Sequence, residues 1–250
     1  MSPRPLDKQS LLVRELQIMD AALDLVSKTD ISLLTMDKVV AQVPYSKGTV
    51  YGHFSSKEDL LAGIANHSLR TMIVLFQRAL EHDGSSRDRY MAMQFAYLLW
   101  SLLNPTLFRT CICAKSPAVW GKASAERMQE HEALEQKMLT VWHRIIDDGL
   151  TEGQFTLPAH MNKQQVAFSG WAGGYGTIML LSDDIESCAG RNGLYLEREY
   201  FNSMNIYMDG LGWGPLSTEK DYRKVLHQIL EDRFSDELNE LRSRGRQLML

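Results

Sequence analysis

Residues 35–61 constrain the fold of this chain more than any other stretch, because they hold two helix starts on either side of a proline. Thr35 can cap a first helix and Ser46 a second, since a hydroxyl side chain accepts a hydrogen bond from a backbone amide at a helix start. Pro44 separates the two helices, because proline donates no hydrogen bond within a helix and restricts the residue before it. The stretch therefore predicts two short helices joined by a tight turn.

The second of these helices is too short and too polar to fold alone. Isolated helices below about 12 residues are marginal in water, so something outside the helix must stabilise it. Val50 and Phe54 are four residues apart and supply an inner, apolar face. The outer face carries the small or hydrogen-bonding residues Ser46, Lys47, Thr49 and Tyr51. This combination is typical of a helix-turn-helix unit, whose second helix lies in the DNA major groove.

The charge of this segment is opposite to that of the whole chain. No acidic residue lies between Lys38 and Lys57, and together with Lys47 these lysines give a local charge of +3 in a chain of net charge −4. Phosphates require positive charge. Residues 71–250 hold nineteen Lys/Arg against twenty-three Asp/Glu, which excludes a generally basic coat for nucleic acid. DNA binding would therefore depend on a small basic patch that a dimer doubles.

Residues 46–60 read SKGTVYGHFSSKEDL, which resembles the signature of the tetracycline-repressor (TetR/AcrR) family. Residues 18–26 are similar to that family's first helix. The resemblance implies an all-α transcriptional regulator, with a three-helix helix-turn-helix domain at residues 1–56 joined to a larger helical ligand-binding and dimerisation domain at residues 57–250. We predict contacts with double-stranded DNA by Thr35, Ser46, Lys47, Gly48, Thr49, Tyr51, His53 and Lys57.

Three positions depart from the family pattern. The first helix ends at Thr29-Asp30, where a glycine would be expected, although Asp tolerates the left-handed conformation better than most residues. Pro44 stands where the family usually has a turn glycine, and proline cannot take the left-handed conformation that glycine can, so the turn is expected to differ in detail. Gly52 stands where a larger residue is common, which costs about 1 kcal/mol of helix propensity and removes a potential contact.

The remainder of the chain has helical periodicity and no useful β-alternation. Apolar residues repeat every three or four positions from Leu12 to Val26, which predicts a first helix. Residues 1–10 are predicted to be a mobile arm, whose Arg4 and Lys8 either approach DNA or are merely solvated. A turn at residues 82–86 precedes a nearly apolar, buried helix at residues 90–103. A long amphipathic helix is predicted at residues 120–150, and its solvent-facing charges are Glu126, Arg127, Glu130, Glu132, Glu135 and Lys137.

Two further strong helices are predicted at residues 162–182 and 197–211, and one amphipathic helix at residues 217–245. The first contains four glycines, Gly170, Gly173, Gly174 and Gly176, which lower helix stability unless a close approach requires them. The family resemblance implies that these two helices form the interface of a homodimer. Packing within a buried core explains the same glycines equally well.

Large, soft side chains are frequent in the middle of the chain. The resemblance implies a cavity between the central helices, and apolar residues line most ligand pockets. The candidate ligand-binding residues are Phe95, Leu99, Phe108, Trp120, Met128, Trp142, Trp171 and Tyr175. No Arg or Lys cluster lies among them, so we expect a small apolar ligand. The alternative that they simply fill a core remains open.

Other features limit the possible classes of protein. No apolar segment approaches the roughly 18 residues of a membrane helix and the N-terminus lacks a signal sequence, so we expect a cytoplasmic protein that does not enter a membrane. Three cysteines, Cys111, Cys113 and Cys188, support neither a disulfide framework nor a metal site, and no cofactor is expected. One alternative is a small helical enzyme that uses Cys111 or Cys113 with His131 or His143 and Asp147. Another is an interaction protein that binds a protein partner together with DNA.

Overall fold

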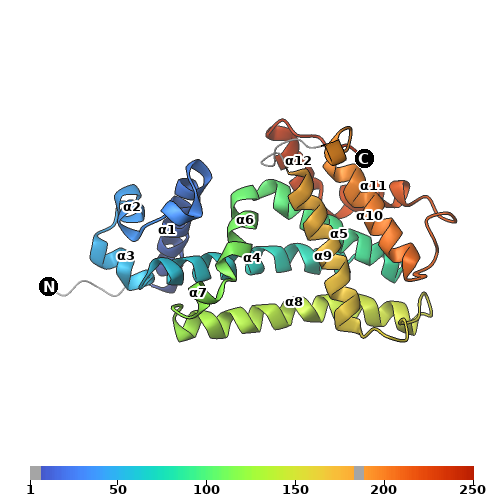
Figure 1. Cartoon of the computed structure of the whole chain (residues 1–250), viewed down its shortest axis with the longest axis horizontal. Coiled ribbons are helices and arrows are strands. Elements are labelled where there is room, and N and C mark those ends of the chain that lie inside the picture. Colours follow the sequence, from blue (N-terminus) through green and yellow to red (C-terminus); the bar gives the residue numbers. More distant parts are fainter. Residues whose placement is uncertain (1–6, 183–188) are drawn as a thin grey trace. The chain divides into compact units, whose positions relative to one another are not determined.

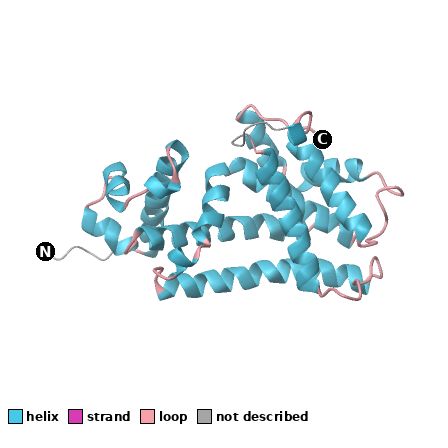
Figure 2. Cartoon of the chain, viewed as in Figure 1, coloured by secondary structure: helices cyan, strands magenta, loops and turns pink. Residues whose placement is uncertain are grey.

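The structure of the chain is a computed structural model that describes residues 7–182 and 189–250. Within these residues it consists of helices and connecting loops, without a strand, as the sequence predicts (Figure 2). The chain divides into two compact units. The first comprises Met1–Arg70 and Asn104–Glu135, and the second comprises Thr71–Leu103 and Gln136–Leu250. The predicted domain boundary after residue 56 stays a prediction.

The first unit contains the predicted helix-turn-helix (Figure 1). Its elements are α1 (Lys8–Lys28), the 3-10 helix η1 (Ile31–Leu33), α2 (Met36–Gln42), α3 (Lys47–His53), the start of α4 (Lys57–Leu80), α6 (Pro105–Ala114), α7 (Pro117–Trp120) and the start of α8 (Ala125–Thr151). Ile18, Met19, Val39, Val50 and Phe54 are buried and form a shared core of α1, α2 and α3. The predicted caps are confirmed, because Thr35 and Ser46 accept the amide protons of Lys38 and Thr49.

The first helix is longer than its apolar pattern predicts. Asp7 caps α1 and accepts the N–H of Ser10 at 2.8 Å, so the residues from Lys8 onward are helical and do not belong to an arm. Leu12, which the pattern places on the inner face, is exposed, and Ala22 is buried instead. Arg4, a residue of the predicted arm, lies outside the described residues.

The second unit is arranged around α5 (Ser86–Leu103), which is buried along almost its whole length, as predicted. Its other helices are the ends of α4 and α8, then α9 (Lys163–Leu181), α10 (Leu196–Gly210), α11 (Tyr222–Arg233) and α12 (Ser235–Ser243). Helices α9, α10, α11 and α12 all pack against α5, and α9 packs on α10. A short 3-10 helix, η2 (Ala189–Arg191), precedes α10.

The predicted single helix at residues 217–245 is wrong, since the chain forms α11 and α12 with a break at Phe234. Phe234 has a φ of −132°, outside the helical region, and its ring is fully buried. The ring lies 5.4 Å from the guanidinium carbon of Arg78 on α4. The chain therefore leaves the helical conformation at the residue whose ring is buried.

A fully buried arginine joins α5 to the C-terminal part of the second unit. Arg87 donates hydrogen bonds to the backbone carbonyl of Trp213 and, at 3.0 Å, to Oδ1 of Asn205. Its Nη2 lies 2.7 Å from Oδ1 of Asp209, and its guanidinium stands 4.3 Å above the ring of Tyr222. One side chain thus contacts α10, the loop after it and the start of α11.

Candidate nucleic-acid interface

Helix α3 is held by its cap and by two buried side chains. The hydroxyl of Ser46 accepts the N–H of Thr49 at 3.1 Å and lies 2.9 Å from the hydroxyl of Thr49. Val50 and Phe54 are fully buried, so they fix the inner face of the helix. The opposite face is accessible, with Lys47 and Tyr51 exposed. Its side chains can therefore reach a ligand without any rearrangement of the core.

Both glycines of α3 border open space. A Cβ atom at Gly48 would meet only the hydroxyl of Ser46, at 3.9 Å, and one at Gly52 would meet nothing within 4 Å. Packing within the chain therefore does not require a glycine at either position. Small residues leave the helix backbone accessible, which suits close approach to a large ligand such as DNA.

Lys47 has an acidic neighbour that the charge pattern of the segment does not predict. Its ammonium lies 2.8 Å from Oδ1 of Asp37, which immediately precedes the segment without acidic residues. The hydrogen bond from Lys47 to Asp37 raises the pKa of the lysine, so the ammonium is charged at neutral pH. Both side chains are largely exposed, and exposed ion pairs are weak. A phosphate can therefore replace Asp37 as the partner of Lys47.

The other two lysines of the segment donate to backbone carbonyls of η1. Lys57 donates to Ile31 at 2.7 Å and to Ser32 at 3.2 Å, and Lys38 donates to Leu33 at 2.8 Å. These bonds fix η1 against the starts of α2 and α4. An ammonium has three N–H donors. The phosphate contact predicted for Lys57 stays a prediction, and it would have to use the third donor or replace one carbonyl.

His53 ends α3 and is half-buried. Burial lowers its pKa, the positive charges of Arg14 and Arg127 lower it further, and the opposing effect of Glu15 is smaller than the burial effect. The imidazole is therefore neutral at pH 7. The DNA contact that we predict for His53 would be a hydrogen bond from a neutral ring and would add no positive charge.

Arg127 corrects a prediction, since the sequence pattern assigned it to the solvent-facing side of the long helix. Only 12% of its side chain is exposed. Its guanidinium donates to Glu15 Oε1 at 2.9 Å and to the carbonyl oxygen of His53 at 3.0 Å. Its Nε lies 3.3 Å from Oδ1 of Asp59. No local signal in the sequence indicates these contacts, because 74 residues separate Arg127 from His53.

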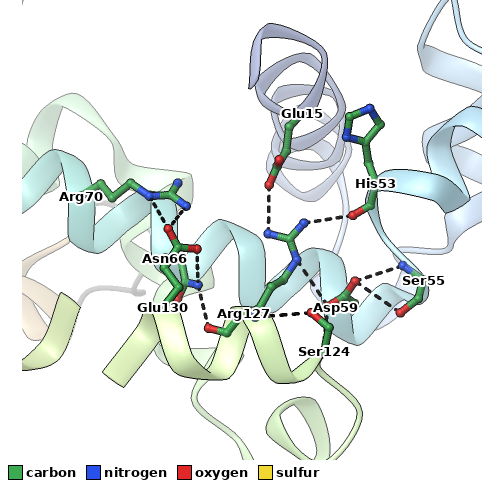
Figure 3. A network of polar contacts seen from close by, with 9 residues as sticks. All are labelled: Glu15, His53, Ser55, Asp59, Asn66, Arg70, Ser124, Arg127 and Glu130. Carbon is green, nitrogen blue, oxygen red and sulfur yellow. Dashed lines mark hydrogen bonds and ion pairs between the residues drawn. The ribbon is translucent and has the colours of Figure 1, made fainter. Parts of the chain in front are cut away.

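Asp59 lies at the centre of the same cluster (Figure 3). Its carboxylate accepts the backbone N–H of Ser55 and of Ser124, each at 3.0 Å. Burial alone would raise the pKa of Asp59, but these two amide donors and the charge of Arg127 outweigh it, and the pKa is lowered. Asp59 is therefore ionised at neutral pH and joins the start of α4 to the start of α8.

The eight candidate ligand-binding residues are distributed over both units. Phe95, Leu99 and Trp142 are buried in the second unit, and Phe108 is buried in the first. Trp120 and Tyr175 are half-buried, whereas Met128 and Trp171 are exposed. Two pockets of about 480 and 530 Å³ lie elsewhere in the second unit, around residues 191–197 and beside residues 199–209. The proposed set of ligand contacts stays a prediction.

Comparison with known proteins identifies the N-terminal region. Residues 18–64 match the family of bacterial regulatory proteins known as the tetR family. This region of the chain is therefore of the tetR family. The matched residues include α2, α3 and the start of α4, and therefore the whole of the candidate interface.

Solved structures of several bacterial regulatory proteins resemble the fold. A bacterial regulatory protein from Rhodococcus RHA1 is 19% identical with a TM-score of 0.62, and the match covers 80% of this chain and 97% of that chain. PfmR from Thermus thermophilus is 17% identical with a TM-score of 0.60, over 78% and 98% of the two chains. FadR from Bacillus subtilis, solved in complex with stearoyl-CoA, is 13% identical with a TM-score of 0.61, over 78% and 98%. No curated protein matches the chain.

A metal site and a membrane-spanning helix are both absent from the part of the chain that the structure describes. It contains no group of three His, Cys, Asp or Glu residues that could hold a metal ion, and no helix long and apolar enough to cross a membrane. Cys111 is a buried free thiol and Cys113 an exposed one, while Cys188 lies outside the described residues.

Proposed function

We propose that this tetR-family protein is a cytoplasmic, ligand-responsive repressor that binds a palindromic operator as a homodimer and is released by a small apolar ligand. The observation that supports DNA reading most strongly is the accessible polar face of α3, backed by the buried side chains of Val50 and Phe54. Lys47 supplies charge for a phosphate, and Thr49 is the residue that we expect to touch a base edge or a thymine methyl group.

An exposed apolar surface on α9 and α10 supports the homodimer. Of the 19 residues of α9, only Lys163 is charged. Its inner face is buried, yet Phe168 is 60% exposed and Leu180 is 64% exposed, and on α10 Ile206 is 72% exposed. A helix that is apolar on all sides is normally covered on all sides. A second copy of the chain would cover this surface, with the same patch on both protomers.

The sequence left two explanations open for the glycines of α9, namely packing within the chain and the interface of a dimer. A Cβ atom at Gly170 would lie 1.8 Å from the hydroxyl of Tyr90, and one at Gly174 would lie 2.8 Å from that of Tyr200, so both glycines permit close packing within the chain. A Cβ atom at Gly173 or Gly176 would meet nothing within 4 Å. We infer that this second pair lies on the dimer face, where small residues allow a partner helix to approach closely.

The proposal of an apolar ligand has two supports. FadR from Bacillus subtilis, which is similar in fold, was solved with stearoyl-CoA, whose acyl chain is apolar and whose coenzyme A part carries phosphates, so the support concerns the acyl chain alone. Several of the candidate residues, such as Phe95 and Leu99 on α5, lie in the apolar interior of the second unit. A ligand that binds one conformation of the dimer better than another changes the geometry of the two reading helices and therefore their fit to paired half-sites.

The alternative of a cysteine-dependent enzyme has less support. Burial raises the pKa of the Cys111 thiol, and a protonated thiol is a poor nucleophile. Since no catalytic sequence motif surrounds Cys111 or Cys113, we favour DNA binding over catalysis. An interaction protein on the same fold would differ in showing no preference among DNA sequences.

Replacement of Lys47 by Ala is expected to weaken binding to all DNA sequences. Each lost phosphate contact lowers the slope of log affinity against log salt by about 0.9, so the loss of two contacts in a dimer lowers it by about two. The measurement is a fluorescence-anisotropy titration at several salt concentrations, with DNA from upstream of the chain's own gene and with an unrelated duplex.

Lys28→Ala is the matched control, since Lys28 is an equally exposed lysine that pairs with Asp24 at 2.6 Å on α1. It is expected to leave both affinity and salt slope unchanged. An unchanged salt slope for Lys47→Ala would show that this face of α3 does not meet the DNA backbone.

A further inference from the structure

Among the described residues, the guanidinium of Arg127 links α8 to the end of the reading helix (Figure 3). Its donors meet three different elements: Glu15 on α1, the carbonyl of His53 at the end of α3, and Asp59 on α4. In addition, its central carbon stands 4.4 Å above the ring of Phe54, the residue that caps α3.

These contacts stabilise the part of α3 that is least able to stabilise itself. The last carbonyls of any helix lack partners within that helix, and a positive charge near them is favourable. Helix α3 has only seven residues, so it depends on neighbours for its order. Arg127 supplies a charged hydrogen bond to this end and packs on the buried ring that anchors it, so it caps the reading helix from outside the helix-turn-helix.

Close packing at this point requires a glycine on α4. A Cβ atom at Gly63 would lie 2.7 Å from the ring of Phe54 and 3.0 Å from Nη1 of Arg127. The backbone of α4 therefore lies so close to the ring and the guanidinium that only glycine fits at position 63 without a shift of its neighbours. The guanidinium and the ring fill a site with little spare room.

The start of α8 is itself fixed to α4, so Arg127 has a defined position. The N–H of Ser124 donates to Asp59, and the side-chain amide of Asn66 donates to the carbonyl of Arg127 at 2.9 Å. Arg70 also pairs with Glu130 one turn further along, but both side chains are about one third exposed, so this pair contributes little to the position of Arg127. A shift of the α8 start would therefore withdraw the guanidinium from α1, α3 and α4 together.

We propose that Arg127 is a positioning residue for DNA reading, which sets the reading helix α3 in place through the carbonyl of His53 and the ring of Phe54 without touching DNA itself. This proposal rests on the DNA-reading function proposed for α3. It makes the reading helix dependent on α8, a helix that continues to Thr151 in the second unit.

Arg127→Met tests the proposal, because methionine keeps an apolar stem but removes every donor. Amide hydrogen exchange, followed by mass spectrometry in the free protein, is expected to become about tenfold or more faster at residues 47–54, as a lost hydrogen bond to a charged group permits. Exchange in α9 and α10 is expected to stay unchanged. Affinity for DNA from upstream of the gene is expected to fall about tenfold or more at a temperature where the variant is folded. Arg127→Lys keeps the positive charge but not the planar guanidinium, so it should restore part of both losses.

Arg70→Met is the matched control, since it removes an ion pair between α4 and α8 in the same unit and leaves the contacts of Arg127 with α3 in place. It is expected to leave exchange at residues 47–54 and DNA affinity unchanged. Unchanged exchange in Arg127→Met, or equal effects of the two variants, would overturn the proposal. If wild-type protein shows no sequence-dependent DNA binding, the proposed function fails, while the exchange measurement still decides whether Arg127 holds α3.

Discussion

The Ile206→Glu variant is expected to be monomeric and to lose tight binding to DNA. Ile206 is 72% exposed on α10, so a glutamate there should leave the fold of one protomer intact. In a symmetric dimer the substitution occurs twice, and burial of an unpaired carboxylate is costly. We expect the dissociation constant of the dimer to rise at least about a hundredfold, which corresponds to the loss of a strong interface contact. Sedimentation velocity and a DNA titration measure the two effects.

Val74→Glu is the control for this experiment. Val74 is 57% exposed on α4 in the second unit, so it tests whether any exposed apolar residue of this unit has the same effect. It is expected to remain dimeric and to bind DNA as the wild type does. A dimeric Ile206→Glu variant would place the interface away from the exposed face of α10.

Replacement of Arg87 by Met is expected to lower the stability of the second unit by about 3–5 kcal/mol, because it removes one member of a buried ionic and hydrogen-bonded cluster. The carbonyl of Trp213 and the amide of Asn205 would each lose a donor, and Asp209 would lose its cation. For a domain of this size the melting temperature should fall by about 10 °C. Calorimetry or thermal unfolding followed by circular dichroism measures this fall.

Arg223→Met provides the comparison, since Arg223 is an exposed arginine on α11 that lies 5.9 Å from the ring of Phe201. Its loss is expected to change the melting temperature by no more than about 2 °C. Similar melting temperatures for the two variants would show that the buried cluster does not hold α11 against α5.

Features with a local cause could be predicted from the sequence. The caps at Thr35 and Ser46 depend on a residue and its neighbours three positions along the chain, and both are present. The apolar helix around residues 90–103 and the break at Pro44 have equally local causes. For the same reason the helix-turn-helix, and with it the resemblance to the tetR family, could be recognised from one short stretch.

Features that depend on distant residues could not be predicted. Arg127 has the sequence setting of a surface residue, and only the folded chain brings it to His53 and Asp59. The pair formed by Lys47 and Asp37 arises because the turn returns α3 towards the start of α2, which a count of charge within one segment cannot detect. The break between α11 and α12 could not be predicted either. The apolar repeat of residues 217–245 continues through Phe234, and a buried aromatic residue fits such a repeat whether or not the helix breaks there.

Selection from a random-sequence DNA library with the purified wild-type protein tests most directly the central claim that α3 reads DNA in a symmetric dimer. We expect enrichment of duplexes with two half-sites related by two-fold symmetry, their centres one helical turn or a multiple of it apart. Replacement of Thr49 should change the preferred bases within the half-sites and leave their spacing unchanged. Retention of DNA without enrichment of any sequence, or enrichment of a single unpaired site, would contradict this claim.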